Sequence, residues 1–245
     1  MSPAVLITGA CGGIGTALSK GFASAGYFVV GTDLTDRSDV GHAYFPCDLA
    51  ELPRSEPAQK AFLDAVTEAV AEHPLTTCIN NAAVQILNPT ADIADEDFDR
   101  TFRVNVFAPF VITRMLLPML RRARGSVINI GSIHATATKP GFVSYATSKA
   151  ALRGLTRSLA VDLGGAVRVN AIEPAAVETD MLLAGFADNP QGYRQLEQFH
   201  PSGHIGRPNE VAQLAFFLAS NQNPFLTGSV IGLDGGIRAR LHDPD

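Results

Sequence analysis

The sequence predicts a three-layer α/β fold in which helices cover both faces of a doubly wound parallel sheet. Short apolar runs alternate with segments of helical period along the chain, and this alternation is typical of parallel sheets built by crossover helices. The runs are apolar throughout, as expected for strands covered on both faces. A length of 245 residues fits a single domain, 1–245, with one sheet.

The individual elements follow from this pattern in order. The predicted strands are the apolar runs at 4–8, 27–30, 43–45, 77–79, 126–130, 167–172 and 229–233. The predicted helices are the segments at 14–25, 58–72, 95–122, 145–163 and 210–220. We expect the helix at 95–122 to bend or break at Pro109 and Pro118, because proline lacks a backbone donor. The helix at 145–163 should end at Gly164 and Gly165.

One segment, 177–208, interrupts the alternation. It is rich in Gly, Pro, His and Asn, and a stretch of this length without clear periodicity is often a functional lid. A pair of short packed helices is the other interpretation, and the two are compatible. We therefore expect a substrate lid at about 177–208.

Composition and charge argue against several classes of protein. The formal charge is −5, from 24 acidic and 19 basic residues, which gives no basic stripe for nucleic acid. The densest basic cluster, Arg121, Arg122 and Arg124, is explained by a solvated helix end. No run approaches the ~20 apolar residues of a membrane span, and the first apolar run meets glycines too soon for a signal peptide. We expect neither a nucleic-acid partner nor a membrane partner.

The cysteines Cys11, Cys47 and Cys78 are odd in number and widely spaced. Their spacing indicates no disulfide framework and no metal site. A reducing compartment is the simplest reading, so we expect a cytoplasmic protein that binds no metal.

A glycine-rich loop at 8–15 joins the first predicted strand to the first helix. Glycine lets the backbone approach a pyrophosphate there, and the helix N-terminus offers free N–H groups. Asp33 ends the second strand, 18 residues after Gly15 (33 − 15), where an acid accepts hydrogen bonds from the adenosine ribose. Its charge would repel a 2′-phosphate, so the predicted cofactor is NAD, although Arg37 could soften the preference. A plain turn and a capping aspartate are the alternatives. The predicted cofactor contacts in this region are Gly9, Cys11, Gly12, Gly13, Ile14, Gly15, Asp33 and Leu34.

Tyr145 and Lys149 lie four residues apart at the start of a predicted helix, which puts them on one face. An ammonium group favours the neighbouring phenolate, so Lys149 is expected to lower the pKa of Tyr145 and make it a usable base. Ser132 ends a strand 13 residues earlier (145 − 132), at the sheet edge where α/β folds place their ligands. By itself, a Tyr/Lys pair four residues apart is usually an ordinary pair on a helix surface. The position of Ser132 at the ligand-binding edge of the sheet favours a catalytic role for this pair.

With these motifs the sequence resembles the single-domain short-chain dehydrogenase/reductase family, from Val5 to about Gly236. The resemblance implies a Rossmann-like fold and hydride transfer between nicotinamide and a secondary alcohol or ketone. It is carried by the 8–15 loop, Asn80-Asn81-Ala82, Asn105, Ser132, Tyr145 and Lys149.

The resemblance also implies roles for these residues. Asn105 would help to hold a water in a proton relay, and Ser132 would orient the substrate oxygen. Tyr145 would be the general acid/base, and Lys149 would lower its pKa and bind the nicotinamide ribose. Further implied cofactor contacts are Asn80, Asn81 and Ala82, then Asp48 and Leu49 at the adenine, and Pro174, Val177 and Thr179 at the carboxamide.

Three positions depart from the family pattern. Ala83 and Ala175 stand where glycine is usual, so both need backbone angles that alanine can adopt. Glu173, before Pro174, has no role in this interpretation.

The substrate is predicted only as a class. His134 and Gln85 are candidate substrate contacts, with surface or packing roles as alternatives, and His200 and His204 are weaker candidates. The polar lid favours a small hydroxylated or carboxylated substrate.

Alternative functions remain open at this point. They are an NADP-preferring carbonyl reductase of the same family, an epimerase or dehydratase with bound NAD, a methyltransferase, and a non-catalytic NAD-sensing protein. A sensor would be expected to lose Tyr145 or Lys149, and both are present. The helices at 95–122 and 145–163 are apolar over much of their circumference, and in the family these helices form the main subunit contact, so we also expect a homotetramer.

Overall fold

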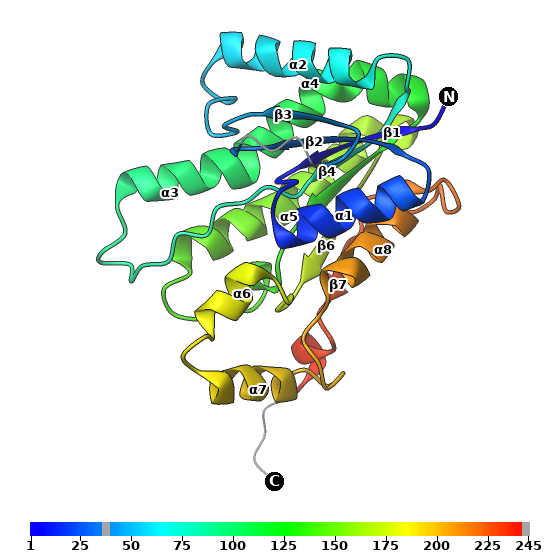
Figure 1. The fold of residues 1–245 in the computed structure, drawn as a ribbon. Helices are drawn as coiled ribbons and strands as arrows, with labels where there is room; N and C mark the ends of the chain where they lie inside the picture. The colour runs from blue at the N-terminus through cyan, green and yellow to red at the C-terminus, as the bar shows by residue number, and fades with distance from the viewer. Residues whose placement is uncertain (36–39, 242–245) are drawn as a thin grey trace.

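The computed structural model describes residues 1–35 and 40–241, and within them the strands form one parallel sheet of seven strands in the order β3-β2-β1-β4-β5-β6-β7 (Figure 1). The strands are β1 (Ala4–Thr8), β2 (Phe28–Asp33), β3 (Ala43–Pro46), β4 (Leu75–Asn80), β5 (Ser126–Ile130), β6 (Arg168–Pro174) and β7 (Val230–Leu233). The predicted fold class is confirmed, and each predicted strand is present with its bounds shifted by a few residues. Arg37 lies outside the described residues.

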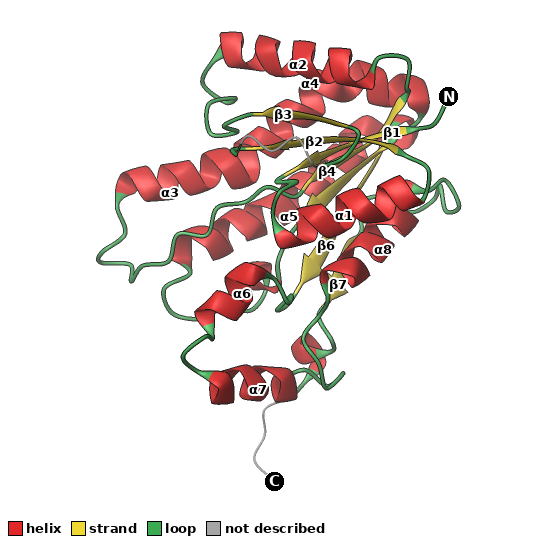
Figure 2. Ribbon diagram, in the orientation of Figure 1, coloured by secondary structure: helices red, strands yellow, loops and turns green. Residues whose placement is uncertain are grey.

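Helices cover both faces of the sheet (Figure 2). On one face α2 (Glu56–Val70), α4 (Ala108–Ala123) and α5 (Val143–Leu163) pack on the strands through residues such as Phe62, Leu116 and Leu163. On the other face α1 (Gly13–Ser24) and α8 (Pro208–Ala219) pack through residues such as Phe22 and Leu218. The inner strands β1 and β5 are fully buried, which explains why their residues are apolar except for Thr8, Ser126 and Asn129.

The strand order reverses direction between β1 and β4, which are neighbours in the sheet. The chain first builds outward from β1 to β3 and then returns to build β4 to β7 on the other side. In open α/β sheets, ligands bind at such a switch point, beyond the carboxyl ends of the strands. The fold therefore predicts that a ligand binds at the loops that follow β1 and β4.

The long helical segment differs from its prediction. It is divided into α3 (Asp95–Phe102), a π-helical turn at Arg103–Phe107 and α4. Pro109 falls in the first turn of α4, where a missing N–H costs little, whereas Pro118 lies inside α4 without ending it. The predicted interruption is present, but it comes just before Pro109. At Pro118 a bend or break was predicted, and the helix does not break there.

By length and composition alone, the run Asp95–Ala123 is apolar enough to cross a membrane. Half of its most apolar window is buried inside the fold, as expected of a helix that packs on a sheet. The basic cluster at Arg121 and Arg122 occupies the last turn of α4, and Arg124 follows in the left-handed conformation, so these arginines mark a helix end.

The segment at 177–208 contains two short helices, α6 (Asp180–Gly185) and α7 (Pro190–Phe199). Figure 1 places both beyond the end of β6, the side on which the loops after β1 and β4 also lie. This confirms the pair of helices, and its position is compatible with a lid.

Candidate active site

The glycine-rich loop after β1 is fastened to the loop after β4. The Thr8 hydroxyl accepts hydrogen bonds from the backbone N–H groups of Asn81 and Ala82, both at 3.1 Å. The Asn81 side chain in turn donates to the carbonyls of Thr8 at 3.0 Å and Gly9 at 2.9 Å. Gly9 has a φ of +65°, and a Cβ there would lie 2.7 Å from the Ala82 Cα. Glycine is required at this position both for the backbone angle and for the close approach.

The same loop faces the segment that follows β6. A Cβ on Gly13 would lie 2.9 Å from Cγ2 of Thr179, which caps α6 by accepting from the Leu182 N–H. Within the described residues no side chain caps the N-terminus of α1, so its N–H groups remain available to an anion. This cradle fits the pyrophosphate of a dinucleotide, as the sequence predicts.

Asp33 lies beside the loop and is held in place by two backbone groups. One carboxylate oxygen accepts from the Cys11 N–H at 2.9 Å and the other from the Leu34 N–H at 2.7 Å. Leu34 itself is exposed. Both the capping role and a ribose contact are compatible with this geometry, because a carboxylate has spare lone pairs.

The remaining predicted cofactor residues divide into surface and core positions. Asp48 accepts from the Ala50 N–H at 2.9 Å, and Leu49 is buried beside it. Asn80 points into the core, where its side chain donates to Asn129 at 2.8 Å. Its side chain therefore supports the sheet edge, and the neighbouring Asn81 and Ala82 make the contacts to the loop.

Ser132, Tyr145 and Lys149 come together at the carboxyl edge of β5. Ser132 caps a short 3-10 turn, and its hydroxyl is hydrogen-bonded to the phenol of Tyr145. The Lys149 ammonium lies 5.5 Å from the centre of the Tyr145 ring and donates to the Ile130 carbonyl at 2.8 Å. The predicted cluster is therefore present.

The pKa values correct one expectation. Burial raises the pKa of Tyr145, and the hydrogen bond from Ser132 acts in the opposite direction. Burial also lowers the pKa of Lys149 to about 8, while the nearby Glu173 carboxylate acts to raise it. The expected lowering of the Tyr145 pKa by Lys149 is absent from this structure, because desolvation of the phenol dominates.

Asn105 lies in the π-helical turn and is almost fully buried. Its side-chain oxygen accepts from the Val84 N–H at 2.9 Å, and its amide nitrogen donates to the Val84 carbonyl and to Ser148 Oγ, each at 3.0 Å. Such turns often mark functional sites. Asn105 thus joins the loop after β4 to the helix that carries Tyr145.

Comparison with known proteins agrees with this geometry. A family model described as enoyl-(acyl carrier protein) reductase matches residues 9–238. The chain belongs to the short-chain dehydrogenase/reductase family. It is 33% identical over 240 residues to the 3-oxoacyl-[acyl-carrier-protein] reductase FabG of Thermotoga maritima, covering 95% of this chain and 96% of that protein. It is also 33% identical over 248 residues to a cyclopentanol dehydrogenase of Comamonas, covering 96% of each.

Solved structures of the family superpose on the whole chain. The ligand-free aldohexose dehydrogenase of Thermoplasma acidophilum has a TM-score of 0.91 at 27% identity and covers 100% of this chain and 97% of its own. Among other similar structures, a 3-oxoacyl reductase of Agrobacterium tumefaciens carries NADP and a 4-hydroxyisoleucine dehydrogenase carries NADH. This short-chain dehydrogenase/reductase is thus an NAD(P)-dependent oxidoreductase that acts on alcohol and ketone groups.

Family members usually have glycine at the positions of Ala83 and Ala175. Within the described residues the only non-glycine positions with positive φ are Ala71 and Arg124, so both alanines adopt ordinary backbone angles. Val177 is buried and forms an isolated bridge with Gly206, which fixes the path of the chain after Pro174.

His134 is the candidate substrate residue whose ring packs against Tyr145. Its ring stacks on Phe142 at 4.2 Å and meets the Tyr145 ring edge-on at 5.8 Å. Burial, with a smaller contribution from Lys139, lowers the pKa of His134 to about 4. His134 is therefore a neutral wall of the site at physiological pH, and Phe142 is a wall residue that sequence reasoning missed.

The other candidates lie elsewhere. Gln85 is exposed on the loop after β4. His200 is buried at the end of α7, where its Nδ1 contacts the Leu196 carbonyl at 2.7 Å, and His204 contacts the Ile205 carbonyl. His200 is packed in the interior and His204 is exposed, which fits the packing and surface roles that were their alternative interpretations.

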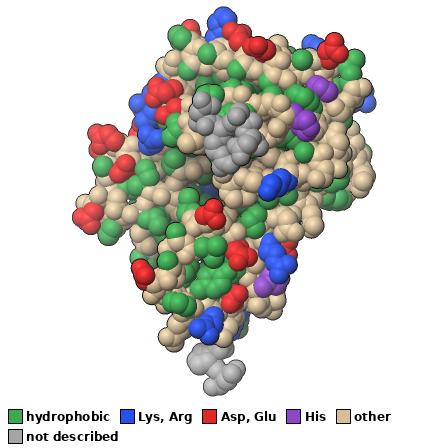
Figure 3. Space-filling model, viewed as in Figure 1, with side chains coloured by type: hydrophobic (Ala, Val, Ile, Leu, Met, Phe, Trp, Pro, Cys, Tyr) green, Lys and Arg blue, Asp and Glu red, His purple; other side chains and the backbone are tan. Residues whose placement is uncertain are grey.

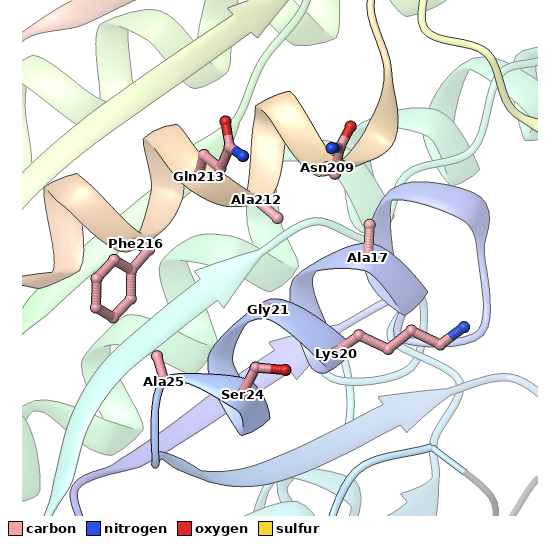
Figure 4. Close-up of a pocket in the computed structure, with 9 residues that line it drawn as sticks. All are labelled: Ala17, Lys20, Gly21, Ser24, Ala25, Asn209, Ala212, Gln213 and Phe216. Carbon is pink, nitrogen blue, oxygen red and sulfur yellow. The ribbon is translucent and has the colours of Figure 1, made fainter.

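A separate groove of about 440 Å³ lies between α1 and α8 (Figure 4). Lys20, Ser24, Asn209 and Phe216 are among its lining residues. None of the catalytic side chains lines this groove, so it is distinct from the site described above.

Proposed function

We propose that this enzyme is an NAD-dependent dehydrogenase that oxidises a secondary alcohol on a small, hydroxylated substrate. The observation that carries the proposal is the surrounding of the Tyr145 phenol, which Ser132 hydrogen-bonds and the neutral ring of His134 meets edge-on. Ser132 would hold the reacting hydroxyl, and Tyr145 as phenolate would accept its proton. When bound, NAD accepts the hydride.

His134 favours a hydroxylated substrate over a carboxylated one. Its Nδ1 is engaged with Thr138 Oγ1 at 3.0 Å, which leaves Nε2 as the nitrogen offered to a substrate. A neutral imidazole exchanges hydrogen bonds with a second hydroxyl but supplies no positive charge for a carboxylate. Two relatives are named for hydroxylated substrates, a galactitol 2-dehydrogenase of Cereibacter sphaeroides, 32% identical over 240 residues, and the aldohexose dehydrogenase above.

A panel of substrates with NAD and NADP tests this function. We expect the highest kcat/KM with NAD and a polyol or sugar, compared with cyclopentanol, simple hydroxy acids and a 3-hydroxyacyl thioester. His134→Phe keeps the ring stack and should lower kcat/KM for the polyol by roughly 10-fold, since one substrate hydrogen bond is lost. Turnover of cyclopentanol should be unaffected.

The control is His73→Phe, because His73 also stacks on a phenylalanine, Phe28, at 4.2 Å, far along the chain from Tyr145. That variant should leave kcat/KM unchanged for all substrates. A preference for NADP with an acyl thioester would favour the second candidate, a carbonyl reductase related in function to the FabG relative, and would contradict the proposal.

We further propose that the protein works as a homotetramer. Exposed apolar side chains on the π-helical turn, on α4 and on α5 support this, with Phe107 47% exposed, Phe110 41% and Val161 84%. Other apolar residues of these helices, such as Leu116 and Leu152, are buried within the subunit. Light scattering coupled to size exclusion should give four times the 25.9 kDa monomer mass. A monomer at micromolar concentration would contradict this proposal.

We also propose that the protein is cytoplasmic and that its partner is a small-molecule substrate. Cys11, Cys47 and Cys78 are all free thiols, and burial raises the pKa of Cys47 to about 11 and of Cys78 to about 12. Free, unreactive thiols suit a reducing compartment. Acidic and basic side chains are interspersed on the face in Figure 3, which supports the absence of a nucleic-acid partner.

A further inference from the structure

Glu173 is a buried carboxylate next to the catalytic edge that the chemistry above does not use. Its side chain is 1% exposed, and it precedes Pro174 at the end of β6. A buried carboxylate is costly unless charged and hydrogen-bonding partners surround it. Its partners therefore show what the fold uses it for.

Two arginines from different parts of the chain hold this carboxylate. Arg153 of α5 forms a two-pronged contact, with Nε 2.8 Å from Oε1 and Nη2 2.6 Å from Oε2. Arg238, in the 3-10 turn Ile237–Ala239, donates to Oε2 at 2.8 Å and through Nε to Asp234 at 2.5 Å. We call Arg153, Glu173, Arg238 and Asp234 the ionic clamp.

Two glycines make room for the ionic clamp. A Cβ on Gly131 would lie 2.8 Å from Cγ of Glu173. Gly232 pairs with Glu173 in the sheet, and a Cβ there would lie 1.7 Å from Nη2 of Arg238. Because any larger residue at either position would displace the carboxylate or its partner, the clamp is matched to its surroundings.

The ionic clamp contacts residues next to the catalytic ones at two places, Gly131 and Thr136. Gly131, against which Glu173 packs, lies between Ile130, whose carbonyl accepts from Lys149, and Ser132. Arg153 follows Lys149 by one helical turn, and both arginines also contact the hydroxyl of Thr136 in the loop after Ser132. The clamp thus joins α5, β6, the loop after β5 and the chain after β7 at one point.

We propose that Glu173 is a positioning residue of the active site, whose carboxylate, fixed by Arg153 and Arg238, packs against Gly131, holds in place the Ile130 carbonyl to which Lys149 donates, and ties the 234–240 segment to the catalytic edge. The inference rests on the catalytic role of Tyr145 and Lys149, but on neither the NAD preference nor the hydroxylated substrate.

The charges around Lys149 set the direction of the expected effects. The groups that face it are Tyr145 on its own helix and Glu173 on β6, with the two arginines and Asp234 behind Glu173. The ionic clamp holds two cations and two anions and is neutral. Removing an anion leaves an excess positive charge, which lowers the pKa of Lys149, whereas removing a cation raises it.

Two substitutions should therefore shift the pKa of Lys149 in opposite directions. Glu173→Gln should lower its pKa by about 1 unit, the lower end of the effect of a close opposite charge. Arg238→Met keeps the two-pronged Arg153 pair and should raise the pKa by roughly half a unit. The pKa can be followed by NMR of lysine labelled with ¹³C at Cε, since the lysines are only Lys20, Lys60, Lys139 and Lys149 and Lys149→Met assigns the signal.

Asp99→Asn is the matched control, because Asp99 also bridges two arginines, Arg54 and Arg103, but on the exposed surface of α3. It should leave the Lys149 signal unchanged. In the active enzyme, the alkaline limb of the kcat–pH profile should move to lower pH in Glu173→Gln and to higher pH in Arg238→Met.

The proposal is overturned if the Lys149 pKa shifts in the same direction in both variants, or in neither. A purely structural role for Glu173 would lower kcat at every pH without moving the alkaline limb of the profile. Circular dichroism shows whether Glu173→Gln folds. If it does not fold, the Arg238→Met variant alone decides: a Lys149 pKa that does not rise in this variant overturns the proposal. The NMR titration needs no turnover, so a failure of the proposed function and a failure of the clamp are distinguishable.

Discussion

Replacing Tyr145 with phenylalanine should lower kcat by at least about 10²-fold, because general acid–base catalysis contributes typically 10²–10⁴-fold. The phenol is the group that Ser132 hydrogen-bonds and that Lys149 approaches, and phenylalanine keeps the ring that packs against His134 and Phe142. NADH affinity, measured by fluorescence titration, should therefore change little, as should the melting temperature.

Tyr27→Phe is the matched control for this variant. Tyr27 also packs edge-on against aromatic rings, Phe22 at 5.0 Å and Phe216 at 6.0 Å, but it lies on the opposite face of the sheet from Tyr145. Its replacement should leave kcat at the wild-type value. Retention of more than about a tenth of the wild-type kcat by Tyr145→Phe would contradict the assignment of the proton-transfer group.

Replacing Asp33 should remove most of the discrimination against NADP. A carboxylate beside a 2′-phosphate costs several kcal/mol of like-charge repulsion, so the ratio of kcat/KM for NAD to that for NADP should fall by roughly 100-fold. Asp33→Asn separates charge from structure, because the amide oxygen can still accept one of the two backbone hydrogen bonds from Cys11 and Leu34.

Asp33→Ala loses both of these hydrogen bonds and should also weaken NAD binding, since the loop at Cys11 is no longer held. Comparing the two variants by steady-state kinetics with each cofactor separates the two roles of the carboxylate. A wild-type preference for NADP, or an unchanged ratio in Asp33→Asn, would contradict the prediction that this carboxylate selects NAD.

Much of the fold could be predicted from local patterns. The inner strands are mostly apolar because both faces of the sheet are covered, and the helix stop at Gly164, which has a φ of +55°, follows from local backbone preference. The π-helical turn around Asn105 could not be predicted, because Pro109 indicates where a backbone donor is missing but not how the preceding turn rearranges. The π-helical turn meets Val84 and Ser148, residues far away in the sequence.

The candidate site shows the same division. Residue type and spacing identified Ser132, Tyr145 and Lys149, since a nucleotide loop and a Tyr/Lys pair are recognisable without coordinates. The pKa of Tyr145 was expected to be lowered, but burial raises it. Desolvation depends on what the rest of the chain packs around a group, and no local pattern records that.

The sequence by itself therefore determined the order of the elements, the family and the candidate catalytic residues, because each depends on residue type at short range. Only the tertiary structure decided what surrounds them. It turned Glu173 from an unexplained residue into the centre of an ionic clamp, because Arg153 and Arg238 lie 20 and 65 positions away in the chain and meet it only when β6, α5 and the end of the chain are packed together.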